Sequence, residues 1–301
     1  MHEVSELEER FGRAGAVRFS ISPLGGPIVT LSAAESEVDI ALKGAQVLSW
    51  RRGGREMLWL SPAGRLDSAK PLRGGIPVCW PWFGPHPDDN MKPAHGFVRT
   101  AAWRPAASSA GPTQAQISLV IATGAGEAGL WPHAARATLT VTLSEQLSLD
   151  LATTNRGTAP LPLTAALHTY FAVGEIAESS IEGLSGHDYM DKLDGDRVKS
   201  QAGRIIIDRE VDRIYLGPAP KIELSDRRLG RRIIVAGRGS ASTVVWNPWI
   251  DKAARLGDLG PDGWRRMLCI ETANAGPDRR MVAPGESTML GVTYSVIDAL
   301  R

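Results

Sequence analysis

Short segments in which hydrophobic and polar residues alternate dominate most of this chain. The clearest is Ala137–Leu143, which reads Ala-Thr-Leu-Thr-Val-Thr-Leu and places threonine at every second position. Because side chains on a strand point alternately to its two faces, this pattern predicts a strand with one buried face. The alternation resumes in Leu147–Asn155 after a Ser-Glu-Gln turn. The two segments together predict an antiparallel hairpin.

Similar short segments, rich in β-branched residues, recur along the chain between Gly, Pro, Ser and Asp residues. They are Ile28–Ser32, Glu37–Leu42, Gln116–Ile121, Ser148–Thr153, Arg204–Ile207, Lys221–Leu224, Arg232–Ala236, Ser242–Trp246 and Ser287–Val296. Helical periodicity is found mainly in residues 1–11, which predict a short amphipathic helix. The pattern predicts an all-β fold, an antiparallel β-sandwich with few short helices. We expect a helical extension over residues 1–15 and a single domain over residues 16–301.

Composition restricts the partners of the protein. The chain has 301 residues, with 34 Lys and Arg against 33 Asp and Glu, so its formal net charge is +1. It has no basic tail and no run of 18 apolar residues, so we expect no nucleic-acid partner, no membrane partner and no transmembrane helix. The acidic first residues lack the apolar stretch of a signal peptide, which indicates a soluble, cytoplasmic protein.

The two cysteines, Cys79 and Cys269, are far apart in the sequence and lie in apolar surroundings. Neither shows the spacing of a Cys/His metal site, so no metal or cofactor is expected. Two buried thiols are one interpretation of this pattern, and a disulfide between them is the other.

Two connections are longer than the rest, Pro71–Arg99 and Leu184–Arg197, and long loops in compact β domains commonly carry function. The first combines Gly-Gly and several prolines with Trp80, Trp82, Phe83 and the polar residues Arg73, His95 and Arg99. Aromatic walls with a few convergent polar groups suit a sugar, whose C–H face packs on a ring. A structural tryptophan cluster at one end of the sandwich explains the same residues equally well.

Two further segments place a proton-transferring side chain beside an apolar run. His168 follows Leu161–Leu167, and an imidazole with an unperturbed pKa of about 6.5 is well suited to move protons at neutral pH. Glu271 lies within Met267–Asn274, where an unpaired carboxylate is costly to bury. A core histidine bonded to a backbone carbonyl, and a structural ion pair for Glu271, are the competing interpretations.

These segments, in this order, resemble the hexose-6-phosphate mutarotase branch of the aldose 1-epimerases. The matching segments are Arg73–Pro85, His95–Arg99, Leu167–Phe171, Val211–Tyr215, Trp246–Trp249 and Cys269–Asn274. The resemblance implies a galactose-mutarotase-like β-supersandwich with an open cleft, and it implies that His168 and Glu271 are the catalytic pair. It also implies four substrate-binding residues, Arg73, His95, Arg99 and Asp212. Relatives often carry Gln where this chain has Ala94, so a substrate hydrogen bond there is expected to be missing or supplied from elsewhere.

The implied chemistry is the interconversion of the α and β anomers of a sugar by ring opening and reclosure. Glu271 would take the proton of the anomeric hydroxyl while His168 gives one to the ring oxygen, and neither step needs a metal or cofactor. Arg73 and Arg99 are fork-shaped donors suited to bidentate phosphate contact. We therefore expect a small-molecule sugar phosphate as partner, glucose 6-phosphate first, and a monomeric protein.

Three alternatives stay open at this point. The first is a mutarotase of unphosphorylated aldoses with the same catalytic pair. The second is a carbohydrate-binding sandwich without catalysis, for which His168 and Glu271 would not be needed together. The third is a structural or interaction domain with its tryptophan-rich loop buried, and it predicts that no accessible cleft lies near residues 73–99.

Overall fold

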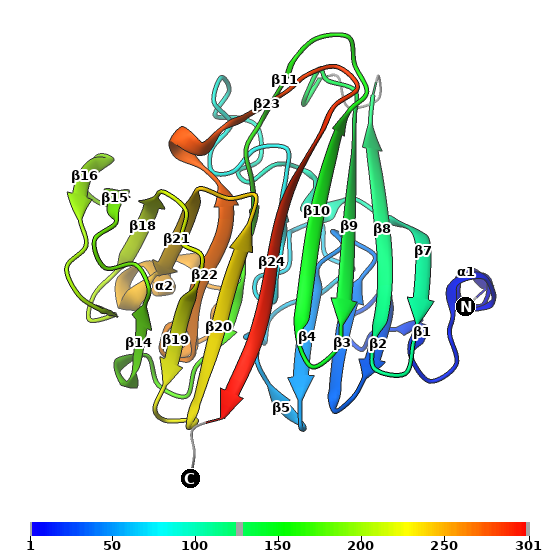
Figure 1. Ribbon diagram of the computed structural model, residues 1–301, viewed down its shortest axis with the longest axis horizontal. Coiled ribbons are helices and arrows are strands. Elements are labelled where there is room, and N and C mark those ends of the chain that lie inside the picture. Colours follow the sequence, from blue (N-terminus) through cyan, green and yellow to red (C-terminus); the bar gives the residue numbers. More distant parts are fainter. Residues whose placement is uncertain (1, 125–128, 299–301) are drawn as a thin grey trace.

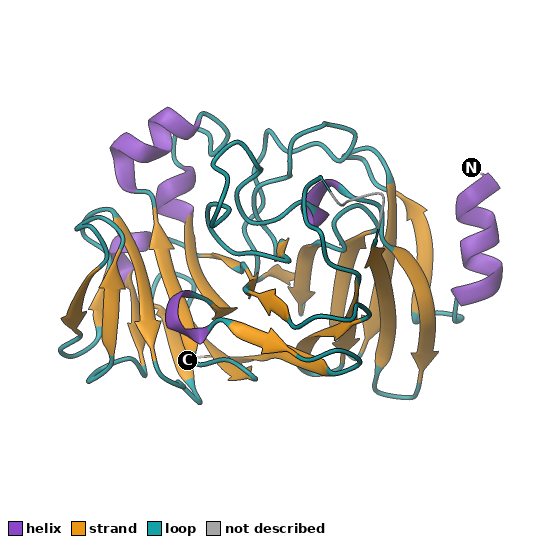
Figure 2. Ribbon diagram, turned by 90° about the horizontal axis from the view of Figure 1, so that it is seen from above, coloured by secondary structure: helices purple, strands orange, loops and turns teal. Residues whose placement is uncertain are grey.

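The computed structural model describes residues 2–124 and 129–298, and in this part of the chain β-strands dominate (Figures 1 and 2). The longest sheet has nine strands in the order β17-β14-β19-β20-β24-β10-β9-β8-β7. Their bounds are β17 Ile205–Ile206, β14 Ser179–Glu182, β19 Ile222–Asp226, β20 Arg231–Arg238, β24 Ser287–Asp298, β10 Leu147–Asn155, β9 Ala135–Leu143, β8 Ala115–Thr123 and β7 Arg104–Ala110. The neighbours in this sheet pair in the antiparallel direction.

Two further sheets stack against the long sheet, one behind each half of it (Figure 1). The sheet behind β8 and β9 consists of β1 Val17–Ile21, β2 Pro27–Ala33, β3 Ser36–Ala41, β4 Val47–Arg52 and β5 Arg55–Glu56. The sheet behind β24 consists of β16 Arg197–Ser200, β15 Asp188–Asp191, β18 Val211–Leu216, β21 Ser242–Asn247, β22 Met267–Asn274, β12 Ala165–Leu167 and β6 Val78–Cys79, with β13 Tyr170–Ala172 also paired to β22. A small sheet joins β11 Leu161–Leu163 to β23 Arg280–Val282. This layered arrangement confirms the predicted antiparallel β-supersandwich.

The predicted hairpin is present as β9 and β10, with Leu143 opposite Leu147. Both strands alternate between buried and partly exposed side chains along their whole length. The buried leucines and valines face the main hydrophobic core, while the threonines of β9 face outward. Each of the other predicted strand segments also overlaps an observed strand.

Helices are few and short in the described ranges. Those described are α1 His2–Phe11, α2 Trp249–Leu256 and α3 Gly263–Arg266, with 3-10 turns η1 Val98–Thr100, η3 Ile176–Glu178 and η4 Gly276–Asp278. Figure 2 shows α1 at one end of the molecule, where it agrees with the predicted N-terminal helix and contacts β1 and β7. None of the helices in the described ranges is long and apolar enough to cross a membrane.

The long connections agree with the sequence analysis in one case and differ in the other. Pro71–Arg99 is largely irregular and contains only β6 and the start of η1. Leu184–Arg197, expected to be a loop, instead contains β15, which pairs with β16 and β18 at the edge of its sheet. The strand was missed because its residues Asp188–Asp191 are half polar and only Tyr189 is fully buried. Edge strands of this kind carry a weak hydrophobic signal.

Candidate active site

The floor of the candidate site is β22, a strand buried over its whole length. Its side chains alternate between two different environments. Leu268 and Ile270 pack into the main hydrophobic core, whereas Met267 and Cys269 belong to a second apolar cluster on the opposite face. Glu271 lies two residues after Cys269, so the period of the strand directs its carboxylate to the same face as the cysteine.

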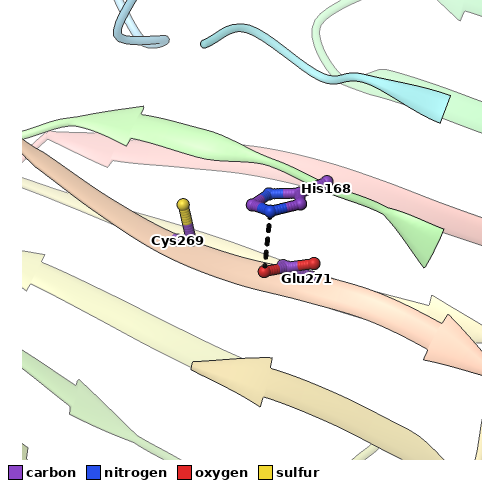
Figure 3. Close-up of side chains that lie close together, drawn as sticks. All are labelled: His168, Cys269 and Glu271. Carbon is purple, nitrogen blue, oxygen red and sulfur yellow. Dashed lines mark ion pairs between the residues drawn. The ribbon is translucent and has the colours of Figure 1, made fainter. Parts of the chain in front are cut away.

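Strand register brings His168 to Glu271. Leu167 in β12 is opposite Thr272, and Tyr170 in β13 is opposite Cys269, so the residues between them meet as cross-strand neighbours. The His168 Nε2 and Glu271 Oε1 atoms lie 3.4 Å apart (Figure 3). The two residues that the sequence singled out separately therefore form one pair.

The irregular path of the Gly74-Gly75 segment positions His168 from its other side. The backbone N–H of His168 donates to the carbonyl of Pro77 at 3.0 Å, and that of Tyr170 donates to the carbonyl of Gly75 at 2.9 Å. Gly75 has a φ of +61°, and a Cβ there would lie 2.0 Å from the carbonyl oxygen of Val47. Only glycine fits this approach of the loop to the sheet.

Aromatic rings fix the plane of the His168 imidazole. It stacks on Tyr170 with a centroid distance of 4.7 Å and an interplanar angle of 7°. Trp246 stands nearly perpendicular to it, with centroids 6.2 Å apart. The register of β18 against β21 sets Asp212 opposite Trp246, which adds a carboxyl group to the same face. The imidazole is therefore held in orientation by packing as well as by the backbone.

These side chains border a cleft with a volume of about 360 Å³. Its lining residues are Arg73, Phe83, Ala94, His95, Arg99, His168, Tyr170, Asp212, Val244, Trp246, Lys252, Leu256 and Glu271. All six residues named as site candidates from the sequence are among them. The cleft contradicts the structural-domain alternative, which required residues 73–99 to be buried without an accessible opening.

Burial shifts the pKa values of the pair in opposite directions. It raises the pKa of the Glu271 carboxyl well above its ordinary value, and the charge of Asp212 adds to this effect. It lowers the pKa of the His168 imidazole well below its ordinary value, and three neighbouring basic side chains act in the same direction. Both shifts favour the uncharged forms of the two groups. Among the described residues, Glu271 Oε2 and His168 Nδ1 are buried without a hydrogen-bond partner.

His95 faces the pair from the aromatic loop, with its ring centroid 5.8 Å from that of His168. The backbone N–H of Gly84 donates to His95 Nδ1 at 3.3 Å, so the ring accepts at Nδ1 and carries its proton on Nε2. Burial, followed by the charges of Arg99 and Arg73, lowers the pKa of His95 to about 3. His95 is therefore a neutral hydrogen-bond donor at the wall of the cleft.

The two predicted phosphate-binding arginines differ in how far they are already engaged. Arg73 donates from Nε to both carboxylate oxygens of Asp258, at 2.7 and 2.8 Å, and from a terminal nitrogen to the hydroxyl of Tyr170 at 3.4 Å. Arg99 donates from one terminal nitrogen to the carbonyl of Ala94 at 2.6 Å, and its buried Nε has no partner in the described structure. Arg99 thus has more of its donors free for a ligand.

Two charged residues of the site were missed from the sequence. Lys252 in α2 contacts Glu210 at 2.9 Å and Asp212 at 3.5 Å, and Asp258 follows the same helix and holds Arg73. Burial raises the pKa of Asp212, and Lys252 opposes this shift. The sequence Asn247-Pro248 followed by a polar and apolar mixture is a helix-start signal that could have located α2. It could not have indicated that α2 lies over the cleft.

The thiols of Cys79 and Cys269 are both free and buried, which decides against a disulfide. Burial raises the pKa of the Cys79 thiol to about 12 and that of Cys269 well above its ordinary value. The sequence showed no metal-ligand spacing around either residue. The fold nevertheless brings Cys269 beside His168 and Glu271, with one potential ligand atom of each within 4.8 Å of the others.

Comparison with known proteins gives a consistent result. The family profile described as Aldose 1-epimerase matches residues 27–295. A relative from Cenchrus ciliaris, provisionally named a glucose-6-phosphate 1-epimerase, is 36% identical over 246 residues, covering 78% of this chain and 74% of its own. A relative of the same provisional name from Escherichia coli K12 is 31% identical over 257 residues, covering 84% of this chain and 85% of its own.

Solved structures extend the comparison to the fold. A Salmonella typhimurium protein provisionally described as a mutarotase superposes with a TM-score of 0.86 at 26% identity, covering 94% of each chain. Galactose 1-epimerase from Lactobacillus acidophilus NCFM superposes with a TM-score of 0.75 at 16% identity, covering 94% of this chain and 99% of its own. The second likeness concerns the fold alone.

Proposed function

The chain belongs to the aldose 1-epimerase family, and we propose that its cleft interconverts the α and β anomers of a hexose 6-phosphate, glucose 6-phosphate first. The observation that carries this proposal is the buried His168–Glu271 pair, 3.4 Å apart in a cleft that also holds Arg73 and Arg99. The names of the relatives support the same substrate class.

Before ring opening, the His168–Glu271 pair holds one titratable proton. Transfer of this proton from Glu271 to His168 gives the carboxylate and imidazolium that the reaction needs. Glu271 then takes the proton of the anomeric hydroxyl, the bond between C1 and the ring oxygen breaks, and His168 protonates that oxygen. The product is the open-chain aldehyde. After rotation about the C1–C2 bond, the same two transfers run in reverse and close the ring on the other face of the carbonyl.

The unpartnered atoms of the pair give the substrate a role in this proton transfer. A sugar hydroxyl that donates to Glu271 Oε2 stabilises the carboxylate form, and burial makes such a bond stronger than it would be in water. The stacking of His168 on Tyr170 keeps the imidazole in one orientation through both halves of the reaction. Trp246 and Phe83 supply apolar walls against which the C–H face of the sugar packs.

The phosphate group is assigned to the arginine side of the cleft. Arg99 offers a buried Nε without a partner, and Arg73 offers the terminal nitrogens that Asp258 leaves free. Charge-assisted bonds of this kind are roughly twice as strong as neutral ones. Because the net charge of the whole chain is only +1, recognition of the anion depends on this local cluster.

The test is exchange NMR of the α and β anomers, with glucose 6-phosphate and free glucose compared at equal concentration. We expect Arg99→Ala to lower kcat/KM for glucose 6-phosphate by about 10-fold to 100-fold, in line with about 1.5–3 kcal/mol for a hydrogen bond to a charged group. The rate with free glucose should change little, and Arg18→Ala, an exposed arginine of β1, is the control. Equal rates on both sugars in the wild type, or no effect of either Arg99→Ala or Arg73→Ala, would assign the enzyme to unphosphorylated aldoses.

We also propose that the protein acts as a monomer in the cytoplasm. Its two unpaired thiols suit a reducing compartment. Light scattering on a size-exclusion column should give a mass near 32.3 kDa, and a mass of about twice that value would contradict the monomer.

A further inference from the structure

Three side chains with metal-binding atoms converge at the floor of the cleft. Cys269 and Glu271 project from the same face of β22, and His168 approaches from the neighbouring strand segment (Figure 3). One potential ligand atom of each residue lies within 4.8 Å of the others, and all three residues are at least nine-tenths buried. The anomer exchange proposed above uses the His168 imidazole and the Glu271 carboxylate, and it gives the Cys269 thiol no role.

The spacing of the pair matches that of two ligands on one tetrahedral cation. Zinc binds imidazole nitrogen and carboxylate oxygen at about 2.0–2.2 Å, so two such ligands lie about 3.3–3.5 Å apart. The observed separation of His168 Nε2 and Glu271 Oε1 is 3.4 Å. The Cys269 sulfur would have to approach by at most about 1.3 Å to complete a third position at its usual bond length of about 2.3 Å.

We propose that His168, Cys269 and Glu271 bind a thiophilic divalent cation, such as Zn²⁺ or Cd²⁺, with the fourth position open to the cleft. The bound cation occupies both proton-transferring groups and so blocks anomer exchange. The binding site stands on the geometry alone, whereas the block rests on the proposed function.

The charges of the three ligands match a divalent cation. One thiolate and one carboxylate balance its two positive charges, with the imidazole neutral, and binding releases any proton that these groups hold. The occupied cluster therefore carries no net charge, which avoids the cost of burying one.

The same surroundings make the binding reversible. Histidines of permanent metal sites usually donate their other ring N–H to a carboxylate, carbonyl or water. In the described structure His168 Nδ1 has no such partner, and neither has Glu271 Oε2. The cluster therefore resembles an open, weakly supported site that a cation enters and leaves through the cleft.

Co²⁺ is the spectroscopic probe for the test, with untagged protein and Zn²⁺ as competitor. We expect the wild type to develop a thiolate-to-cobalt charge-transfer band and strong visible bands of tetrahedral cobalt, and Zn²⁺ to remove them. Cys269→Ser should lose the charge-transfer band and bind at least about 10-fold more weakly. Cys79→Ser, which removes a thiol that is equally buried, should keep the bands. No bands in the wild type, or unchanged bands in Cys269→Ser, would overturn the site.

The block is measured separately, by anomer-exchange NMR at increasing Zn²⁺ concentration. Zn²⁺ should slow the wild type and Cys79→Ser, and EDTA should restore both. Cys269→Ser should keep its basal exchange rate and need at least about 10-fold more Zn²⁺ for the same inhibition. Cobalt bands without inhibition would overturn the block.

If the wild type shows no exchange on any hexose tested, the proposed function fails, and the cobalt titration still decides the cation site. Cys269→Ala with a matching circular dichroism spectrum replaces Cys269→Ser if the serine variant does not fold.

Discussion

Two buried acid–base pairs in this molecule have similar composition and opposite surroundings. His168 and Glu271 meet at the cleft, with side chains that are 11% and 1% exposed. Arg231 and Asp226 face one another across the hairpin of β19 and β20, and both are 1% exposed. Burial alone therefore does not distinguish a pair that reacts from a pair that holds the fold.

The Arg231–Asp226 pair is bonded to the backbone around it. Arg231 donates to two backbone carbonyl oxygens, at 2.7 and 2.8 Å, and these belong to segments far away in the sequence. Asp226 accepts from the backbone N–H groups of Gly174 and Leu229, both at 3.0 Å. Each residue thus connects distant loops to the hairpin. Arg231 Nε is the one buried side-chain polar atom of this pair without a hydrogen-bond partner in the described structure, and it lies 3.9 Å from the Asp226 carboxylate.

The His168–Glu271 pair has the reverse arrangement, because Nδ1 and Oε2 lack partners in the described part of the chain. A buried polar group without a partner is costly, and a native structure rarely keeps one without a reason. Here a substrate that enters the cleft can supply the missing bonds. The comparison teaches that a position at the cleft, with an open hydrogen-bonding atom on both residues, distinguishes the proposed reactive pair, and that burial alone does not.

The largest expected effect comes from Glu271→Gln. It preserves the shape of the side chain and removes its ability to accept a proton, so anomer exchange should fall by on the order of 10²-fold to 10⁴-fold. The melting temperature should stay the same or rise, because burial disfavours the charged form of Glu271 and the amide carries no charge. If Glu271→Gln instead had a much lower melting temperature and a normal exchange rate, the His168–Glu271 pair would be structural and its assignment as the reactive pair would be wrong.

The next effect concerns stability. Asp226→Asn leaves the Arg231 guanidinium buried without its counter-charge, and removing one partner of a buried pair typically costs about 3–5 kcal/mol. Urea denaturation should show this loss, while the exchange rate per folded molecule stays unchanged. Asp208→Asn, in an exposed pair with Arg209, is the control and should not move the denaturation midpoint. A folded Asp226→Asn variant of normal stability and low activity would contradict the comparison.

The smallest effect is a pH dependence caused by His95. Its pKa is about 3 in the folded protein and about 6.5 in an unfolded chain, so between these values only the unfolded state takes up the proton. The stability contributed by the neutral ring is therefore present above about pH 6.5 and is lost as the pH falls toward 3.

The slope of stability against pH in this window should become shallower in His95→Gln, by up to about 1.4 kcal/mol per pH unit. Urea denaturation at several pH values measures this slope. His2→Gln, a change at a side chain that is 93% exposed, serves as the control. An unaltered slope in His95→Gln would show that His95 takes up protons in the folded state as readily as in the unfolded state.

Local pattern was sufficient for much of the fold, whereas the candidate site residues were chosen over their structural alternatives only through the family resemblance. The alternation in Ala137–Leu143 predicted β9 because a half-buried strand repeats every two residues. His168 and Glu271 were found as polar residues beside apolar runs. Their contact could not be predicted from either segment, because it depends on the register of β12 and β13 against β22, and register is a long-range property.

The remaining site residues could not be predicted from the sequence for the same physical reason, which is that long-range packing places them. Lys252 and Asp258 enter the site because α2 and the residues after it lie over the cleft, and nothing in a short helix specifies where it packs. Cys269 has a buried apolar neighbourhood in sequence, and its closeness to two other ligand atoms follows only from the strand face and its partner strand. The structural role of the Arg231–Asp226 pair likewise depends on backbone carbonyls that are distant in the sequence and that accept hydrogen bonds from Arg231.

Because β22 is buried on both faces, substitutions in it offer little scope for changing the substrate range of this enzyme. In β22, a substitution at Leu268 or Ile270 disturbs the core, and one at Glu271 changes a proposed proton-transferring group. Variation in substrate range must therefore come from the walls of the cleft, which loops and α2 supply. Ala94, Phe83 and Leu256 are wall positions of this kind, and directed evolution toward other sugars should begin there.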